Sequence, residues 1–230
     1  MKRIIVERVS KIFDDKEEHR KIRVLEDVSF DVEEGKIVGI IGRNGCGKST
    51  LLRIIAEIYN PDKGKIFTKG KKVSLIGMNE GMDLRLTAVD NIFLCCSLLG
   101  LSNKEIKKRL NEIISFAGLE KFANTKLYKF SSGMMARLAF SIATHSINYN
   151  PDILLLDEIF AVGDEEFRMK CFKKIKDIIK NGSTVLIVSH ELEMLEKICD
   201  RIIWLERGRI KKDGGVEILN EYKNFLSAGN

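Results

Sequence analysis

Apolar residues gather along this chain in short continuous runs, which predict buried strands. Such runs lie at 36–41, 153–156 and 184–188. A continuous apolar run of this length is typical of a strand covered on both faces, as in a parallel sheet. Segments 3–9 and 24–32 alternate between apolar and polar residues, which predicts strands with one exposed face. Shorter strands are expected at 65–68, 72–76, 201–205 and 209–211.

Helical spacing of apolar residues dominates another part of the chain, from about 87 to 148. A helix near 106–117 has one apolar face, and Gly118 is expected to end it. Ser131 and Ser132 are both available as N-caps for a later helix in this part. Helices are expected at 51–56, 89–99, 106–117, 134–147, 167–179, 191–198 and 216–226.

Two stretches of polar residues predict connections. The charged stretch 11–23 predicts an exposed loop that carries one aromatic residue, Phe13. The sequence Asn-Pro-Asp-Lys-Gly at 60–64 is a strong turn signal.

The order of these elements predicts the fold class. Strands that alternate with helices imply an α/β protein with a mainly parallel sheet. We expect one domain, residues 1–230, in which about 1–86 and 149–230 form a catalytic core with an N-terminal antiparallel β subdomain. The remaining stretch, about 87–148, is expected to form a helical subdomain.

Composition places the chain among globular proteins. It has 230 residues, of which 44% are hydrophobic and 31% charged, and no apolar run approaches the length of a membrane span. Glu7 interrupts the first apolar stretch, so no signal peptide is expected and a cytoplasmic location is favoured. The net charge of +6 permits nucleic acid, acidic lipid or nucleotide partners, but interleaved Lys and Glu favour a solvated surface. The chain contains no glutamine.

The five cysteines show no spacing typical of metal ligands. Cys95 and Cys96 are adjacent in an apolar helical pattern, which favours a packing role. Cys46 is either a modifiable thiol or a tolerated variable position.

Between the run at 36–41 and the helix at 51–56, the sequence fits the spacing G-x-x-x-x-G-K-[ST]. In such a loop, glycines let backbone N–H groups turn around an anion, and the following helix adds its positive dipole end. Lys48 would reach the β- and γ-phosphates, and the Ser49 hydroxyl would bind Mg²⁺. A glycine-rich turn with a chance lysine is the alternative, but the strand–loop–helix context favours nucleotide binding. The expected binding residues are Gly42, Asn44, Gly45, Cys46, Gly47, Lys48, Ser49 and Thr50.

Polar side chains follow two further buried strands. Asp157 and Glu158 come directly after the run at 153–156, and His190 follows the run at 184–188. Ligands gather at the carboxyl ends of parallel strands. Asp157 therefore suits a Mg²⁺-linked carboxylate, and Glu158 could polarise an attacking water. The alternatives are acidic helix caps and a structural histidine.

Five ordered motifs make the chain resemble the nucleotide-binding domain of an ABC transporter over nearly its whole length. The phosphate loop reads GRNGCGKST, and the second nucleotide motif reads ILLLDE. The family's signature, normally close to LSGGQ, has its counterpart in Phe-Ser-Ser-Gly-Met at 130–134, with Arg137 at the usual distance. A trailing loop follows at 160–164, and the switch histidine is His190.

This resemblance implies a P-loop NTPase core, and ATP hydrolysis, with Mg²⁺, at a head-to-tail dimer of two copies of the chain. Each ATP would lie between Lys48 of one copy and Ser131 and Gly133 of the other. By the same resemblance, Glu158 would be the general base, His190 would contact the γ-phosphate, and Asp164 would couple the two sites.

Phe13 occupies the place where the family stacks adenine on an aromatic ring, and its alternative role is an ordinary loop anchor.

Two departures from the family pattern narrow this reading. The signature SSGM, and the trailing loop AVGDEEF with Lys170 and Cys171, resemble ATPases that export teichoic acid, O-antigen or capsule. This implies export of a lipid-linked polysaccharide through a separate integral membrane permease, with the chain peripheral on the cytoplasmic face of the membrane. The second departure is the loop 77–83, which lacks the family's glutamine. Either Asn79 or Glu80 could take the place of that glutamine.

The same resemblance implies that Leu84, Leu86 and the helix from Val89 line the groove for the permease.

Other functions stay open from the sequence alone. One is an exporter of another amphipathic cargo, and another is a soluble ABC ATPase acting on DNA or ribosomes. About 80 residues separate Lys48 from the signature, which leaves room for a helical subdomain but not for a long coiled coil. No nucleic acid partner is therefore expected.

Overall fold

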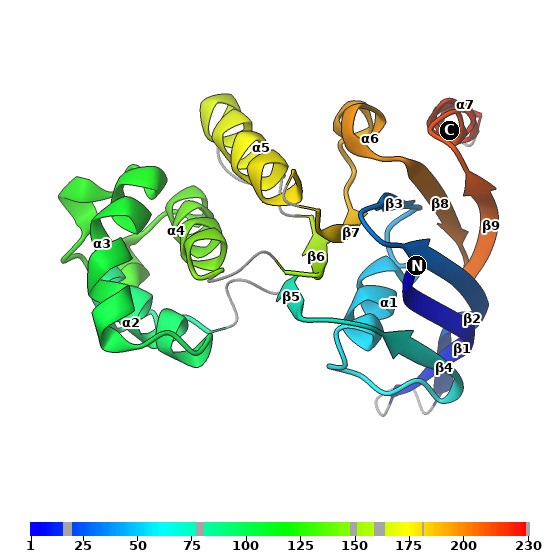
Figure 1. Ribbon diagram of the computed structural model, residues 1–230, viewed down its shortest axis with the longest axis horizontal. Coiled ribbons are helices and arrows are strands. Elements are labelled where there is room, and N and C mark those ends of the chain that lie inside the picture. The colour runs from blue at the N-terminus through cyan, green and yellow to red at the C-terminus, as the bar shows by residue number, and fades with distance from the viewer. Residues whose placement is uncertain (16–19, 77–80, 148–150, 159–163, 181, 229–230) are drawn as a thin grey trace. The chain divides into compact units, whose positions relative to one another are not determined.

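The structure, a computed structural model, describes residues 1–15, 20–76, 81–147, 151–158, 164–180 and 182–228 (Figure 1). The chain forms two compact units. The first comprises residues 1–76, 151–158 and 179–230. The second comprises residues 77–150 and 159–178.

The first unit contains an antiparallel sheet in the order β2-β1-β4. Its strands are β1 (Lys2–Asp15), β2 (Arg20–Glu33) and β4 (Lys63–Thr68). The expected loop at 11–23 is wrong at both ends, because β1 and β2 continue as a paired ribbon in which Phe13 lies opposite Ile22. The charged residues of this stretch interrupt the apolar alternation that predicts a strand, so the sequence pattern does not indicate the ribbon.

The second sheet of this unit has the order β5-β6-β7-β3-β8-β9. Neighbouring strands pair in parallel, except β8 with β9, which are antiparallel. The continuous runs at 153–156 and 184–188 are buried along their whole length, so they are central strands as expected. The strands are β3 (Ile37–Ile41), β5 (Lys72–Leu75), β6 (Ile153–Asp157), β7 (Thr184–Val188), β8 (Arg201–Glu206) and β9 (Arg209–Gly214).

Helix α1 (Lys48–Ile55) packs into the main core of this unit. Its residues Leu51, Leu52 and Ile55 are fully buried, and the same core holds residues from both sheets. Burying such side chains stabilises the fold by about 1.5–3 kcal/mol each. Two further helices, α6 (Leu192–Ile198) and α7 (Ile218–Ser227), complete the unit.

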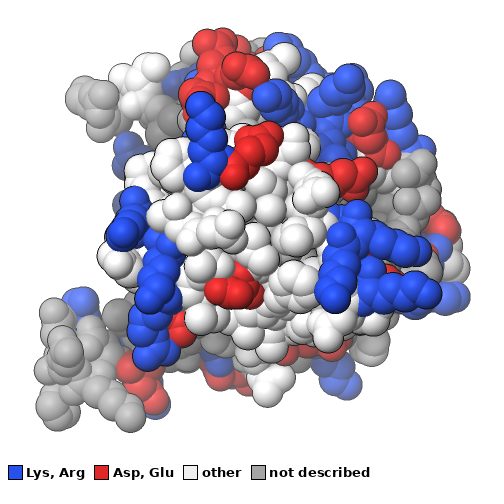
Figure 2. Space-filling model, turned by 90° about the vertical axis from the view of Figure 1, so that its left-hand side faces the viewer, with Lys and Arg blue, Asp and Glu red and all other residues white. Residues whose placement is uncertain are grey.

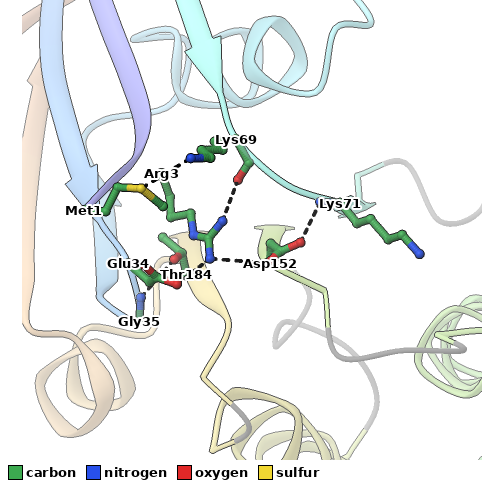
Figure 3. A network of polar contacts seen from close by, with 8 residues as sticks. All are labelled: Met1, Arg3, Glu34, Gly35, Lys69, Lys71, Asp152 and Thr184. Atoms are coloured by element: carbon green, nitrogen blue, oxygen red, sulfur yellow. Dashed lines mark hydrogen bonds and ion pairs between the residues drawn. The ribbon is translucent and has the colours of Figure 1, made fainter.

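A polar network centred on Arg3 joins the two sheets (Figure 3). The Arg3 guanidinium contacts the carboxylates of Glu34, directly after β2, and Asp152, directly before β6. Asp152 accepts hydrogen bonds from the backbone N–H groups of Lys71 (2.8 Å) and Thr184 (2.9 Å). The network therefore ties together the residues at the starting ends of β5, β6 and β7.

The second unit is helical, with α2 (Ala88–Leu98), α3 (Asn103–Ala117), α4 (Ser132–His145) and α5 (Glu165–Ile179). Short 3₁₀ turns lie at Glu120–Phe122 and Leu127–Lys129. Capping boxes begin α2 at Thr87 and α3 at Ser102, and Gly118 ends α3 in the left-handed conformation, as expected. None of the helices in the described ranges is long and apolar enough to cross a membrane.

Cysteine packing in this unit follows the sequence analysis. Cys95 and Cys96 are buried in the helical core beside Ile92 and Ile142. Burial raises the pKa of the Cys95 thiol to about 11. Both residues therefore pack in the core, where the Cys95 thiol also donates to the Gly81 carbonyl (3.5 Å) and Cys96 Sγ lies 3.2 Å from Ser146 Oγ.

The observed elements form an α/β P-loop fold with a mainly parallel sheet, an antiparallel β sheet and a separate helical unit. This confirms the predicted fold class.

Candidate nucleotide-binding site

The phosphate loop joins the end of β3 to the start of α1. Gly42, Gly45 and Gly47 all have positive φ angles, of 152°, 77° and 106°. A Cβ atom on Gly42 would lie 2.1 Å from the Leu205 carbonyl oxygen, and one on Gly47 would lie 2.7 Å from that of Val24. Only glycine fits at these two positions, because both the backbone angle and the space exclude a side chain.

Lys48, the first residue of α1, is buried and turns back over the loop. Its Nζ donates hydrogen bonds to the carbonyl oxygens of Gly42 (2.8 Å) and Arg43 (3.1 Å). A cation is thereby held within the loop itself, where it can meet a phosphate group.

The loop opens onto a cavity of about 640 Å³, built by the first unit alone. This volume suits a nucleotide-sized ligand. The lining residues are Phe13, Val24, Asn44, Gly45, Gly47, Lys48, Ser49, Thr50, Arg53, Tyr59 and Glu158.

Cys46 points away from this cavity and into the core of the first unit. Burial raises the pKa of its thiol, and its carbonyl oxygen accepts a hydrogen bond from the N–H of Gly208 (3.1 Å). Of the two interpretations of Cys46, the readily modified thiol does not fit this environment. The side chain packs as an apolar group.

The two expected Mg²⁺ ligands meet at one edge of the cavity. The Ser49 hydroxyl donates a hydrogen bond of 3.2 Å to Asp157 Oδ1. Burial raises the pKa of Asp157, an effect partly opposed by the hydrogen bond from Ser49. Hydroxyl and carboxylate oxygens fit Mg²⁺, which prefers hard oxygen ligands and binds through few protein groups together with phosphates.

Ser49 and Asp157 fit a metal site in which the remaining ligands come from the phosphates and not from the protein. In the described ranges, no group of three or more His, Cys, Asp or Glu side chains could hold a metal ion.

Glu158 and His190 also come together at the carboxyl ends of neighbouring strands. His190 Nε2 lies 3.0 Å from Glu158 Oε1, and both side chains are half exposed. Glu158 adopts a φ of 50°, a conformation that costs about 1–3 kcal/mol for a residue with a side chain. This turn directs the Glu158 side chain to the cavity that the phosphate loop lines.

Phe13 also lines the cavity, and it lies in the paired ribbon and not in a loop. Its ring meets that of Tyr59 edge to face, with 5.6 Å between the ring centroids. The guanidinium of Arg53 lies 5.9 Å from the centroid of Tyr59. Val24 and the rings of Phe13 and Tyr59 give the cavity an apolar, aromatic end, beside which the Arg53 guanidinium lies.

Sequence reasoning missed Val24, Arg53 and Tyr59. Tyr59 directly precedes the Asn-Pro turn at 60–61, and an aromatic residue so close to the phosphate-loop helix was the signal that could have found it.

The remaining site candidates lie in the second unit. Ser131 is exposed and caps α4, accepting a hydrogen bond from the Met134 N–H (3.2 Å), whereas Ser132 is already helical. Gly133 lies in the first turn of α4. Asp164 Oδ1 accepts a hydrogen bond from the Phe167 N–H (2.9 Å) at the start of α5. Residues 77–80 and 160–163, including Asn79 and Glu80, lie outside the described residues.

Comparison with known proteins agrees with this geometry. A family model described as ABC transporter matches residues 25–161. An O-antigen export system ATP-binding protein from Klebsiella pneumoniae is 43% identical over 209 residues, 90% of this chain and 84% of the relative. A teichoic acids export ATP-binding protein from Staphylococcus haemolyticus is 38% identical, over 96% of this chain and 82% of the relative.

A solved structure also resembles this chain. It is a dimeric ATP-binding cassette in a post-hydrolysis state, bound to ADP and Pi. It matches with a TM-score of 0.77 and 27% identity, over 93% of this chain and 98% of that chain. The chain is therefore a nucleotide-binding ATPase that belongs to the ABC transporter family.

Proposed function

We propose that this chain is the ATP-hydrolysing subunit of an exporter that moves a lipid-linked polysaccharide through a separate membrane permease. The observation that carries the proposal is the single cavity onto which the phosphate loop, Ser49 and Glu158 all open. The cargo is inferred from the relatives, whose names refer to O-antigen and teichoic acid export.

Binding would begin at the phosphate loop. Lys48 exchanges its hydrogen bonds to the Gly42 and Arg43 carbonyls for phosphate oxygens, and the N-terminus of α1 adds its dipole. Phe13, at the aromatic end of the cavity, stacks on the base. Ser49 and Asp157 would hold Mg²⁺, which would neutralise charge on the phosphates when bound.

Hydrolysis would depend on Glu158. Its carboxylate accepts a proton from the attacking water, a role that general bases fill within hydrogen-bond reach of the water. His190, 3.0 Å from Glu158, orients this carboxylate and contacts the γ-phosphate.

A second copy of the chain would complete the site. Ser131 and Gly133 lie at the N-terminus of α4, where backbone N–H groups and the helix dipole favour an anion. We propose that they meet the γ-phosphate bound by the partner copy. Asp164 couples the two sites. In this arrangement about 1–86 and 149–230 form the catalytic core, and about 87–148 form the helical subdomain.

The permease would dock on the second unit. Figure 2 shows a broad area made mostly of residues other than Lys, Arg, Asp and Glu, with an acidic side chain within it and charged side chains of both signs around its margins. Exposed apolar side chains of this unit include Leu84 and Tyr128, which are joined by a backbone hydrogen bond of 2.9 Å from the Tyr128 N–H to the Leu84 carbonyl. We propose that this pair, with Leu86 and α2, receives an apolar segment of the permease and holds the chain at the cytoplasmic face of the membrane.

A pull-down from mild detergent tests this proposal. The tagged wild-type chain should recover a multi-span membrane protein together with an undecaprenyl-linked polymer, identified by mass spectrometry. The paired change Leu84→Asp and Tyr128→Asp should lose both while retaining ATP binding. Ile58→Asp, which charges an exposed apolar residue of the first unit, is the matched control.

Two results would contradict the proposal in different ways. A permease recovered with another amphipathic cargo would refute polysaccharide export alone. Recovery of ribosomes or DNA-repair proteins without a membrane protein would favour a soluble ATPase.

A further inference from the structure

The side of the phosphate loop that faces away from the cavity is held by the C-terminal part of the chain. Ile41, the last residue of β3, lies in parallel register with Trp204 of β8. Gly42 packs so closely on Leu205 that the site admits no Cβ atom. The loop therefore starts directly beside β8.

Arg43 extends this contact to α7. It is the residue after Gly42, and its guanidinium carbon lies 5.4 Å from the centroid of the Phe225 ring. The backbone carbonyl of the same residue accepts the hydrogen bond from Lys48 Nζ. Arg43 thus links the cation of the phosphate loop, through its main chain, to an aromatic ring of α7, through its side chain.

Phe225 is itself held in place by an aromatic cluster. Its ring packs against that of Trp204, with centroids 5.0 Å apart and an angle of 61°. Trp204 in turn packs against the buried ring of Tyr222, at 5.1 Å. Lys211 Nζ lies 3.7 Å from the Phe225 centroid and 4.1 Å from that of Trp204. Phe225 is therefore held by its own ring contacts, and the Arg43 guanidinium lies against it.

We propose that Phe225 is a positioning residue for nucleotide binding, acting through Arg43 to hold the phosphate loop in its anion-binding shape. The proposal rests on the assignment of this loop as the nucleotide site. It gives α7 a role in nucleotide affinity although no residue of α7 lines the cavity.

The physical argument is preorganisation. A loop that is already held in its bound shape loses less conformational entropy when the ligand arrives. A cation resting on an aromatic face at a partly exposed site contributes enough to change an affinity about two- to five-fold. ATP and ADP should be affected by the same factor, because the contact acts on the loop and not on the γ-phosphate.

Substitutions at Phe225 separate this role from simple packing. Phe225→Leu keeps an apolar side chain but removes the aromatic face, whereas Phe225→Tyr keeps the face. Phe225→Leu should weaken ATP and ADP binding about two- to five-fold, and Phe225→Tyr should bind like the wild type. Asn224→Ala, an exposed neighbour on α7, is the matched control and should leave both affinities unchanged.

A double-mutant cycle tests the link to Arg43. In a chain carrying Arg43→Ala, the further change Phe225→Leu should have no effect on nucleotide affinity, because the contact is already gone. Binding is measured by calorimetry with ATP and with ADP, and folding is checked by the melting temperature of each variant.

The outcomes decide the proposal. Equal losses from Phe225→Leu with and without Arg43 would overturn it, as would loss in Phe225→Tyr or unchanged affinity in Phe225→Leu. If the wild-type chain bound no nucleotide at all, the assignment of the site itself would fail. A folded wild type that binds ATP but shows no coupling refutes the role of Phe225 alone.

Discussion

Ser49 and Asp157 share a hydrogen bond of 3.2 Å although 108 residues separate them in the chain. The sheet explains how they meet. Ser49 follows β3 and Asp157 ends β6, and the carboxyl ends of parallel strands lie at one edge of the sheet. The pair therefore results from topology, and it places a hydroxyl and a carboxylate where Mg²⁺ could join them to a phosphate.

Asp157→Asn should stabilise the metal-free chain at neutral pH. Burial raises the pKa of Asp157 above its ordinary value of 3.8, so its ionised form is disfavoured in the folded state. Protonated Asp157 makes its full contribution to the free energy of unfolding below the pKa that Asp157 has in the unfolded chain. The wild type loses this contribution as the pH rises through the raised pKa of the folded chain. Asparagine carries no charge but still accepts the Ser49 hydrogen bond.

The measurement is the difference in melting temperature between Asp157→Asn and the wild type, in EDTA. This difference should grow in favour of the variant as the pH rises from the ordinary pKa of 3.8 through the raised pKa of Asp157 in the folded chain. When Mg²⁺ and ATP are added, the melting temperature of the wild type should rise more than that of Asp157→Asn. A difference that is constant with pH would show that Asp157 ionisation does not destabilise the fold.

Particular residues show how far the sequence alone could lead. Gly42, Lys48 and Asp157 could be placed because each sits in a motif of fixed spacing on a predictable strand end. The continuation of β1 through Phe13 could not, because its charged neighbours carry no apolar alternation and the strand is defined by backbone pairing across the ribbon.

Other relationships escape the sequence because they depend on tertiary packing. The inward direction of the Cys46 side chain follows from how the phosphate loop lies on the core. The contact of Arg43 with Phe225 joins opposite ends of the chain, and no local pattern marks it. Spacing rules identify the residues of a motif, whereas the residues that pack against the motif are brought there by the tertiary fold.

Lys48→Ala should weaken ATP binding at least about tenfold, because it removes a charge-assisted hydrogen bond to phosphate. Lys65→Ala removes the same charge from an exposed position on β4 and should leave affinity unchanged. Isothermal titration with ATP measures both. Unchanged ATP affinity in Lys48→Ala would contradict the phosphate-loop assignment.

Phe13→Ala should weaken ATP binding about 5- to 100-fold, the range expected when a base loses an aromatic stacking partner. Binding of tripolyphosphate, which has no base, should be unaffected, because the phosphate loop is intact. Phe67→Ala, on an exposed residue of β4, is the control. An equal loss of tripolyphosphate binding would mean that Phe13 supports the fold of the site and not the base.

The thiols of the folded chain should resist modification. All five cysteines are buried, and burial raises the pKa of both Cys171 and Cys199 to about 12. Thiolates are the reactive species, so a maleimide at pH 7 should label the chain slowly until denaturant exposes all five cysteines. Mass spectrometry locates the label. Fast labelling of native Cys46 would revive its interpretation as a modifiable thiol.

Glu158→Gln provides the sharpest test of chemistry at this site. Glutamine has nearly the same shape, so ATP should still bind through Lys48 and Phe13. It cannot accept the proton of the attacking water, so turnover should fall about 10²- to 10⁴-fold. With hydrolysis blocked and ATP retained, the head-to-tail dimer should accumulate.

Two readouts separate these effects. A phosphate-release assay measures turnover, and size-exclusion chromatography with ATP measures the dimer. Glu193→Gln, which removes the same charge from an exposed position on α6, should behave like the wild type in both. Normal turnover in Glu158→Gln would remove Glu158 as the base. A loss of ATP binding with the loss of turnover would instead assign this carboxylate to holding the nucleotide, because its left-handed turn keeps it at the cavity in either role.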